Sequence, residues 1–192
     1  MSWFQQRPDV SLSLIAQAGV DLAAGVIDIG GGASTLVDHL LAAGHEHPAV
    51  LDVSPVALSE SQARLGARAA EVEWIEQDVT RFGPARRFGL WHDRAVFHFL
   101  TDAADRRLYV QSMRQALKPG GAVIMATFAP DGPMKCSGLE VVRYDEAALL
   151  AELGSDFALE DVRRENHHTP WGAGQRFIYF LLRYSPAAPG AA

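Results

Sequence analysis

Short apolar runs alternate with helical patterns along most of the chain, and this alternation is the feature that most limits the fold. Each run is rich in β-branched residues and has the length of a strand, while the segments between runs repeat apolar residues at helical spacing. Repeated strand–helix units build a doubly wound α/β sheet, with a ligand site at the carboxyl ends of the strands. The runs predict strands over 25–29, 49–53, 73–76, 88–93 and 122–128, and the patterns between them predict helices over 36–41, 55–70 and 103–117.

The last third of the chain departs from this alternation. A loop over 129–144 and a helix over 145–153 precede two further strands, over 157–162 and 176–184. No helical pattern separates these two strands, so we expect them to form an antiparallel pair that closes the sheet.

Composition narrows the class of protein. The chain carries 23 acidic and 17 basic side chains, a net charge of −6, which argues against a nucleic-acid partner. The single cysteine, Cys136, excludes a disulfide within the chain and a cysteine-rich zinc site, and no metal is expected. No apolar segment resembles a membrane span of about 20 residues, so we expect a cytoplasmic protein with no membrane partner. We also expect a monomer or weak dimer, with one domain over 1–184 and a frayed tail over 185–192.

A run of three glycines, Gly30 to Gly32, joins the first predicted strand to the first helix. On its own it is also consistent with a flexible turn. Asp52, however, ends the second strand about 20 residues later, where a carboxylate reaches the ribose of a nucleoside cofactor. Thr35 breaks the third position of the dinucleotide fingerprint, and no P-loop lysine is present. These features together favour an adenosine that carries an amino-acid tail.

The chain resembles the class I S-adenosylmethionine-dependent methyltransferases over nearly its whole length. Four motifs in the right order carry the resemblance: Val26 to Ser34, with Ser34 in place of a third glycine; Asp52; Glu76 to Val79; and Leu117 to Gly121. The resemblance implies a Rossmann-like, seven-stranded class I methyltransferase sheet, mostly parallel with an antiparallel C-terminal strand and with helices on both faces. It also implies S-adenosylmethionine as cofactor and S-adenosylhomocysteine as product.

A closer resemblance is to bacterial methyltransferases that contain a Trp-His-Asp-Arg-Ala-Val-Phe-His-Phe-Leu segment, here Trp91 to Leu100. A related sequence segment after the fourth strand occurs in thiopurine-methyltransferase-like enzymes and in a lineage of protein-lysine methyltransferases. The absence of an appended substrate domain favours a small-molecule acceptor. A protein-lysine acceptor stays open, as does a SAM-binding protein without transferase activity.

The resemblance also assigns the cofactor site. Asp52 would hold the ribose diol, Asp78 the adenine amino group, and the Val79 N–H would face the ring. Aromatic residues near the N-terminus cover the cofactor in relatives, so 1–19 is expected to form a lid. The expected cofactor-binding residues are Trp3, Phe4, Asp28, Gly30, Gly31, Gly32, Ser34, Asp52, Val53, Asp78, Val79 and Asp93.

The catalytic candidates are Asp93, Arg94, His98 and His168. Asp93 ends the fourth strand, where the methyl group should lie, although it could instead cap the next segment. By strand alternation His92 should point to the opposite face. His98 is the preferred general base, with a buried structural histidine as the alternative, and Arg94 could neutralise an anionic acceptor or form an ion pair.

The acceptor pocket is expected between three segments. These are Asp93–His98, the loop Pro130–Tyr144, and a turn from His167 to Gly172 that contains His168 and Trp171. Arg143 in the loop could also meet an anionic acceptor. A plain surface hairpin is the alternative for the turn.

Overall fold

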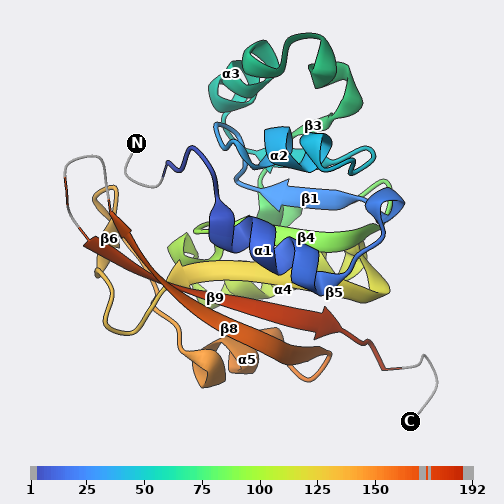
Figure 1. Ribbon diagram of the computed structural model, residues 1–192. Helices are drawn as coiled ribbons and strands as arrows, with labels where there is room; N and C mark the ends of the chain where they lie inside the picture. The colour runs from blue at the N-terminus through green and yellow to red at the C-terminus, as the bar shows by residue number, and fades with distance from the viewer. Residues whose placement is uncertain (1–3, 169–171, 173, 188–192) are drawn as a thin grey trace.

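The computed structural model describes residues 4–168, 172 and 174–187 (Figure 1). Its main feature is a seven-stranded sheet in the order β3-β2-β1-β4-β5-β9-β8. Strand β9 pairs antiparallel with β5 and with β8, and the other pairings are parallel. This confirms the predicted sheet. The strands are β1 (Val26–Ile29), β2 (Ala49–Asp52), β3 (Glu73–Glu76), β4 (Phe88–Arg94), β5 (Leu117–Phe128), β8 (Phe157–His168) and β9 (Gly174–Tyr184).

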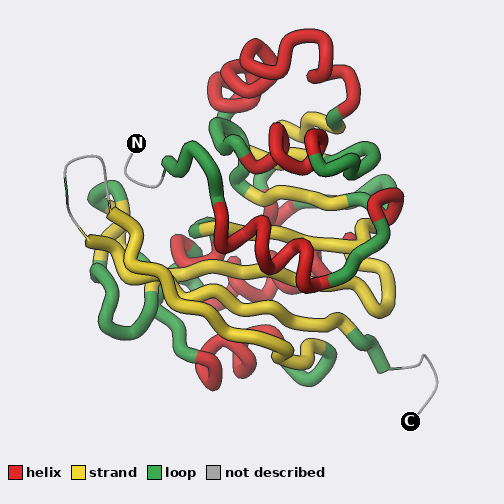
Figure 2. Tube along the Cα trace, in the orientation of Figure 1, coloured by secondary structure: helices red, strands yellow, loops and turns green. Residues whose placement is uncertain are grey.

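Helices cover both faces of the sheet, as predicted (Figure 2). Apolar residues of α1 and α2 pack on one face of the sheet, with α3 beside α2, whereas α4 and α5 pack on the other face. The α-helices are α1 (Asp9–Ala18), α2 (Leu36–Ala42), α3 (Pro55–Leu65), α4 (Ala103–Ala116) and α5 (Glu146–Leu153). Short 3₁₀ helices are η1 (Leu22–Ala24), η2 (Gly66–Glu71), η3 (Val79–Arg81) and η4 (Phe97–Phe99). In the described part of the chain, no helix has the length and apolar character to cross a membrane.

The helix starts follow from local side chains. Ser54, Asp102 and Asp145 each accept a hydrogen bond from a backbone N–H in the first turn of α3, α4 and α5. The third helix was expected to run to residue 70, but α3 ends at Leu65 because Gly66 adopts a left-handed φ of +57°.

Two predicted strand boundaries and one predicted loop differ from the structure. Strand β5 begins at Leu117, so the expected turn at Pro119–Gly120 lies within the assigned strand, where the pairing with β4 is irregular. Strand β8 continues to His168 because its whole length pairs with β9. His167 and His168 therefore lie in a strand and not in a turn. The loop after β5 contains a small hairpin, β6 (Lys135–Cys136) and β7 (Leu139–Glu140).

A buried chain of hydrogen bonds joins α4 to the end of β4. Trp91 Nε1–H donates to the Tyr109 hydroxyl at 2.8 Å, and that hydroxyl donates to Asp93 Oδ2 at 2.5 Å. The same carboxylate accepts the N–H groups of Val96 and Phe97 at 2.7 and 3.0 Å. Asp93 thereby fixes the turn after β4, in which Ala95 has a φ of +73°.

Replacing Tyr109 by phenylalanine should lower the free energy of unfolding by about 1–3 kcal/mol, because Trp91 loses its buried acceptor and Asp93 loses a donor. Urea unfolding followed by circular dichroism measures the change. Tyr144→Phe is the matched control, since the Tyr144 hydroxyl is buried without a hydrogen-bond partner among the described residues. Its removal should be neutral or slightly stabilising. Equal losses in both variants would contradict the role of the chain.

Candidate functional site

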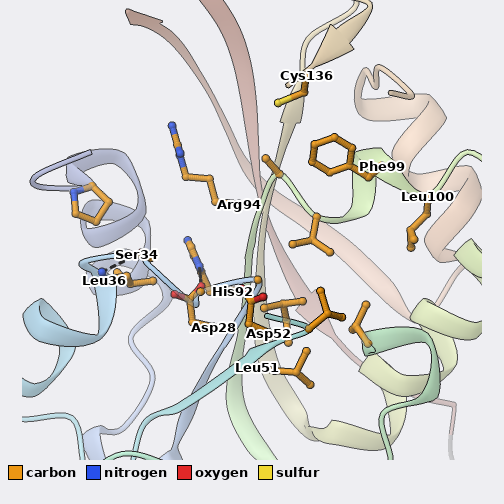
Figure 3. Close-up of a pocket in the computed structure, with 18 of the residues that line it drawn as sticks. Asp28, Ser34, Leu36, Leu51, Asp52, His92, Arg94, Phe99, Leu100 and Cys136 are labelled. Atoms are coloured by element: carbon orange, nitrogen blue, oxygen red, sulfur yellow. Dashed lines mark hydrogen bonds and ion pairs between the residues drawn. The ribbon is translucent and has the colours of Figure 1, made fainter. Parts of the chain in front are cut away.

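A cavity of about 440 Å³ opens at the carboxyl ends of β1, β2 and β4 (Figure 3). This is the end of a doubly wound sheet at which ligands bind. Figure 3 shows two groups of lining residues: Asp28, Ser34 and Asp52 on one side, and Phe99, Leu100 and Cys136 on the other. We call these the nucleoside side and the acceptor side.

The glycine loop lies directly against two carboxylates. Gly30 has a φ of +67°, and its N–H donates to the Leu51 carbonyl at 2.7 Å. A Cβ on Gly31 would lie 2.3 Å from Asp28 Oδ2, and one on Gly32 would lie 2.6 Å from Asp52 Oδ2. No residue larger than glycine fits at these two positions without moving a carboxylate.

Asp52 is oriented by the backbone. Its Oδ2 accepts the Gly32 N–H at 2.9 Å and its Oδ1 accepts the Ser54 N–H at 2.8 Å. The side chain is only partly buried and lines the cavity. Each oxygen keeps acceptor capacity, so this carboxylate can receive the two hydroxyls of a ribose.

Asp28 and His92 lie side by side on the nucleoside side. They are register partners in the parallel pair β1–β4, so their side chains share one face of the sheet. His92 Nδ1 lies 2.7 Å from Asp28 Oδ1. Asp28 Oδ2 is buried and has no hydrogen-bond partner among the described residues.

Asp93 was expected to face the ligand and His92 the opposite side of the sheet, but this register gives the reverse. His92 lines the cavity, while Asp93 points to the opposite face and is fully buried beneath the turn after β4. Asp93 therefore does not face the cavity. Burial raises the pKa of Asp93 to about 6, although its hydrogen bonds from Tyr109, Val96 and Phe97 favour the ionised form. The structure bears out the alternative reading of a capping residue.

Arg94 lines the cavity but belongs to an internal polar cluster. Its Nε donates to the Tyr179 hydroxyl at 2.9 Å, and that hydroxyl donates to Glu165 Oε2 at 2.7 Å. The guanidinium also lies over the Phe177 ring, 4.7 Å from its centroid, and 3.9 Å from Glu165. The charge of Arg94 is thus balanced within the protein, which matches the ion-pair alternative better than a free anion site.

His98 is a buried, uncharged ring. It packs between Phe99 and Phe128, and the Phe128 N–H donates to Nδ1 at 3.4 Å. Burial, with a smaller effect from Arg94, lowers the pKa of His98 to about 3. The ring does not line the cavity. The low pKa makes His98 a weak proton acceptor near neutral pH, and its surroundings match the alternative of a buried structural histidine.

Arg143 does not line the cavity. The side chain of His168, together with Trp171, lies outside the described residues. The Arg143 guanidinium donates to the carbonyls of Pro130 and Gly132, so it braces the loop after β5. That loop nevertheless reaches the acceptor side through Cys136 and Ser137. Burial raises the pKa of the Cys136 thiol, which favours its uncharged form.

Most of the remaining expected cofactor residues do meet at the cavity. Trp3 lies outside the described residues, and Gly32 acts through its N–H on Asp52. Ser34 also accepts the Leu36 N–H at 3.1 Å, and Asp78 accepts from Thr80. The cavity is lined by Phe4, Asp28, Gly30, Gly31, Ser34, Asp52, Val53, Asp78 and Val79.

Several lining residues escaped the sequence analysis. Gln5 and Pro8 reach the cavity because the segment 4–8 crosses its mouth, where Thr35 Oγ1 donates to the Gln5 carbonyl at 3.0 Å. Gln5 Nε2 also donates to Glu165 Oε1 at 2.8 Å. Phe99 and Leu100 were within the segment singled out for its resemblance, but no periodicity shows which of its residues face the cavity.

Comparisons with known proteins agree with this geometry. A family model described as a methyltransferase domain matches residues 26–121, half of the chain. The nodulation protein S of Rhizobium tropici is 26% identical over 125 residues, which cover 65% of this chain and 51% of that protein. The chain thus spans about half the length of this curated relative.

Solved structures share the fold at low identity. The N-methyltransferase NodS from Bradyrhizobium japonicum has a TM-score of 0.74 at 19% identity, covering 93% of this chain and 96% of that one. The 1,6-didemethyltoxoflavin-N1-methyltransferase of Burkholderia thailandensis, solved with bound 1,6-didemethyltoxoflavin and S-adenosylhomocysteine, has a TM-score of 0.73 at 22% identity, covering 93% of this chain and 78% of that one. The chain therefore belongs to the methyltransferase domain family and has the class I fold of S-adenosylmethionine-dependent methyltransferases.

Proposed function

We propose that this protein transfers the methyl group of S-adenosylmethionine to a small-molecule nucleophile. The observation that carries the proposal is the pair of carboxylates beside the glycine loop, one aligned by backbone N–H groups and one with a buried oxygen that has no hydrogen-bond partner among the described residues. A cofactor with a ribose diol and an ammonium group supplies the donors that these two carboxylates lack.

Described residues that line the cavity would bind three parts of that cofactor. Asp52 would receive the ribose hydroxyls, and Asp78 with the Val79 N–H would hold the adenine. Asp28 would receive the ammonium group, and Phe4 in the segment 4–8 would cover the site. Bound S-adenosylmethionine supplies an electrophilic methyl group on a sulfonium centre.

The acceptor side favours a small, largely apolar molecule. Phe99 and Leu100 form one wall, and Cys136 with Ser137 forms another. Burial lowers the pKa of the His98 ring to about 3, which makes it a weak proton acceptor, and raises the pKa of the Cys136 thiol, which disfavours its thiolate. An acceptor that presents its own lone pair, such as an uncharged amine, fits these walls. The N-methyltransferases among the similar structures support a nitrogen acceptor.

An acceptor screen read by S-adenosylhomocysteine release tests the proposal. Cell lysate is separated into small-molecule and protein fractions, and each is incubated with enzyme and S-adenosylmethionine. Turnover with the small-molecule fraction is expected. Turnover only with the protein fraction would replace the proposal by a protein-lysine methyltransferase, and tight cofactor binding with no turnover in either would indicate a binding protein without transferase activity.

The first prediction concerns Asp52. Asp52→Ala removes a charged acceptor of two ribose hydroxyls and should weaken S-adenosylmethionine binding by about tenfold to a hundredfold. Calorimetric titration measures the affinity. Asp102→Ala is the matched control, because it also removes an aspartate that caps backbone N–H groups, at the start of α4. Unchanged affinity in folded Asp52→Ala protein would refute the cofactor assignment.

The second prediction concerns cofactor class. NAD and NADP should bind at least about a hundred times more weakly than S-adenosylmethionine, because Thr35 occupies the third fingerprint position. Its hydroxyl also holds the segment 4–8 over the cavity through the carbonyls of Gln5 and Gln6. Thermal shifts at matched ligand concentrations provide the comparison. Equal stabilisation by NAD would show that the glycine loop serves a dinucleotide.

The third prediction concerns the loop after β5. Arg143→Ala removes the donor to two loop carbonyls and should raise the acceptor KM by about twofold to fivefold, with cofactor affinity within about twofold. Steady-state kinetics on the acceptor found in the screen measures both. Arg176→Ala removes only an exposed ion pair with Asp131 in the same loop, so it should change neither value. An unchanged acceptor KM in Arg143→Ala would separate this loop from acceptor binding.

A further inference from the structure

Three buried side chains from separate elements form a continuous chain on the nucleoside side. Ser11 Oγ of α1 lies 2.9 Å from His92 Nε2 of β4, and His92 Nδ1 lies 2.7 Å from Asp28 Oδ1 of β1. All three residues are at most 2% exposed. The N-terminal helix is thus tied to the carboxylate beneath the glycine loop.

The order serine–histidine–aspartate matches that of a nucleophilic triad, but this one cannot act on a substrate. Ser11 is completely buried and does not line the cavity. A nucleophile must reach the reacting atom, so the chain serves another purpose.

That purpose follows from the two oxygens of Asp28. Oδ1 is occupied by His92, which fixes the rotamer of the carboxylate. Oδ2 then lies against the Gly31 backbone at the cavity, buried and with no partner among the described residues. A buried carboxylate oxygen without a donor is unfavourable, so it is suited to a cationic group that arrives with a ligand.

We propose that Ser11 and His92 are positioning residues for the amino-acid end of the cofactor. His92 holds Asp28 so that Oδ2 receives the cofactor's ammonium group, and Ser11 holds the His92 ring. Helix α1 thereby takes part in cofactor binding through a residue that the cofactor does not touch. This inference rests on the proposed function, because it assigns a role within the same site.

We call the chain of hydrogen bonds from Ser11 through His92 to Asp28 the relay. It is also linked to the segment 4–8, which lines the cavity. Segment 4–8 leads directly into α1, and both Phe4 and Pro8 line the cavity. The hydrogen bond between Ser11 and His92 therefore fixes the position of α1, and with it the position of the segment 4–8 at the cavity.

A comparison of two ligands tests the relay. S-adenosylhomocysteine carries the ammonium group, whereas 5′-methylthioadenosine shares the nucleoside but lacks the amino-acid end. Ser11→Ala should weaken S-adenosylhomocysteine binding by about threefold to tenfold, and His92→Gln by about tenfold to a hundredfold, because Gln no longer reaches Asp28. Binding of 5′-methylthioadenosine should stay within about twofold in both variants. Calorimetric titration gives the four affinities.

Two further variants serve as the positive and the negative control for this comparison. Asp28→Asn should show the largest selective loss for S-adenosylhomocysteine, because it removes the charge itself. Ser13→Ala changes an exposed serine of the same helix, bonded to Arg163, and should leave both ligands unaffected. If the His92→Gln variant does not fold, the affinities of the Ser11→Ala variant for the two ligands test the proposal by themselves.

The outcomes separate the relay from the cofactor assignment. A loss that is equal for both ligands, or no loss for S-adenosylhomocysteine, would overturn the relay while leaving the cofactor in place. Failure of the unaltered protein to bind either ligand would instead overturn the proposed function.

Discussion

The close contact between the glycine loop and two carboxylates is the constraint on which the site depends. Gly31 and Gly32 lie so near Asp28 and Asp52 that a Cβ at either position would overlap a carboxylate oxygen. The loop can therefore approach a ligand while the carboxylates remain beside it. The backbone N–H of Gly32 in turn orients Asp52, so loop and acid form one unit. Substituting either glycine would displace the group that the loop is meant to present.

Much of the fold could be predicted because it follows from local pattern. The alternation of apolar runs and helical periods identified the central strands, and the helices predicted to begin at residues 55 and 103 begin there in the structure, where Ser54 and Asp102 cap them. The glycine loop and Asp52 were likewise placed by short spacings. Strand β8 was underestimated because its second half is polar and is held by pairing with β9, a long-range interaction that no local window contains.

The least predictable feature was the direction of neighbouring side chains. Alternation correctly states that His92 and Asp93 face opposite ways, but it does not say which faces the ligand. That choice depends on the register of β4 against β1, which pairs His92 with Asp28 and Asp93 with Ile29. The sequence therefore predicts that Asp93, at the end of β4, is a catalytic residue. The structure buries its side chain on the face away from the cavity.

In this placement, the last residues of β4 hold both sides of the cavity in position. On one face, Asp93 fixes the turn that leads to Phe99 and Leu100, and so shapes the acceptor side. On the other face, His92 holds Asp28 and so shapes the nucleoside side. Two consecutive residues of one strand thereby set the relative position of the two halves of the cavity. The proposed in-line methyl transfer requires the methyl donor and the acceptor to be held in a fixed geometry, and the rigid strand β4 between the two sides of the cavity would provide it.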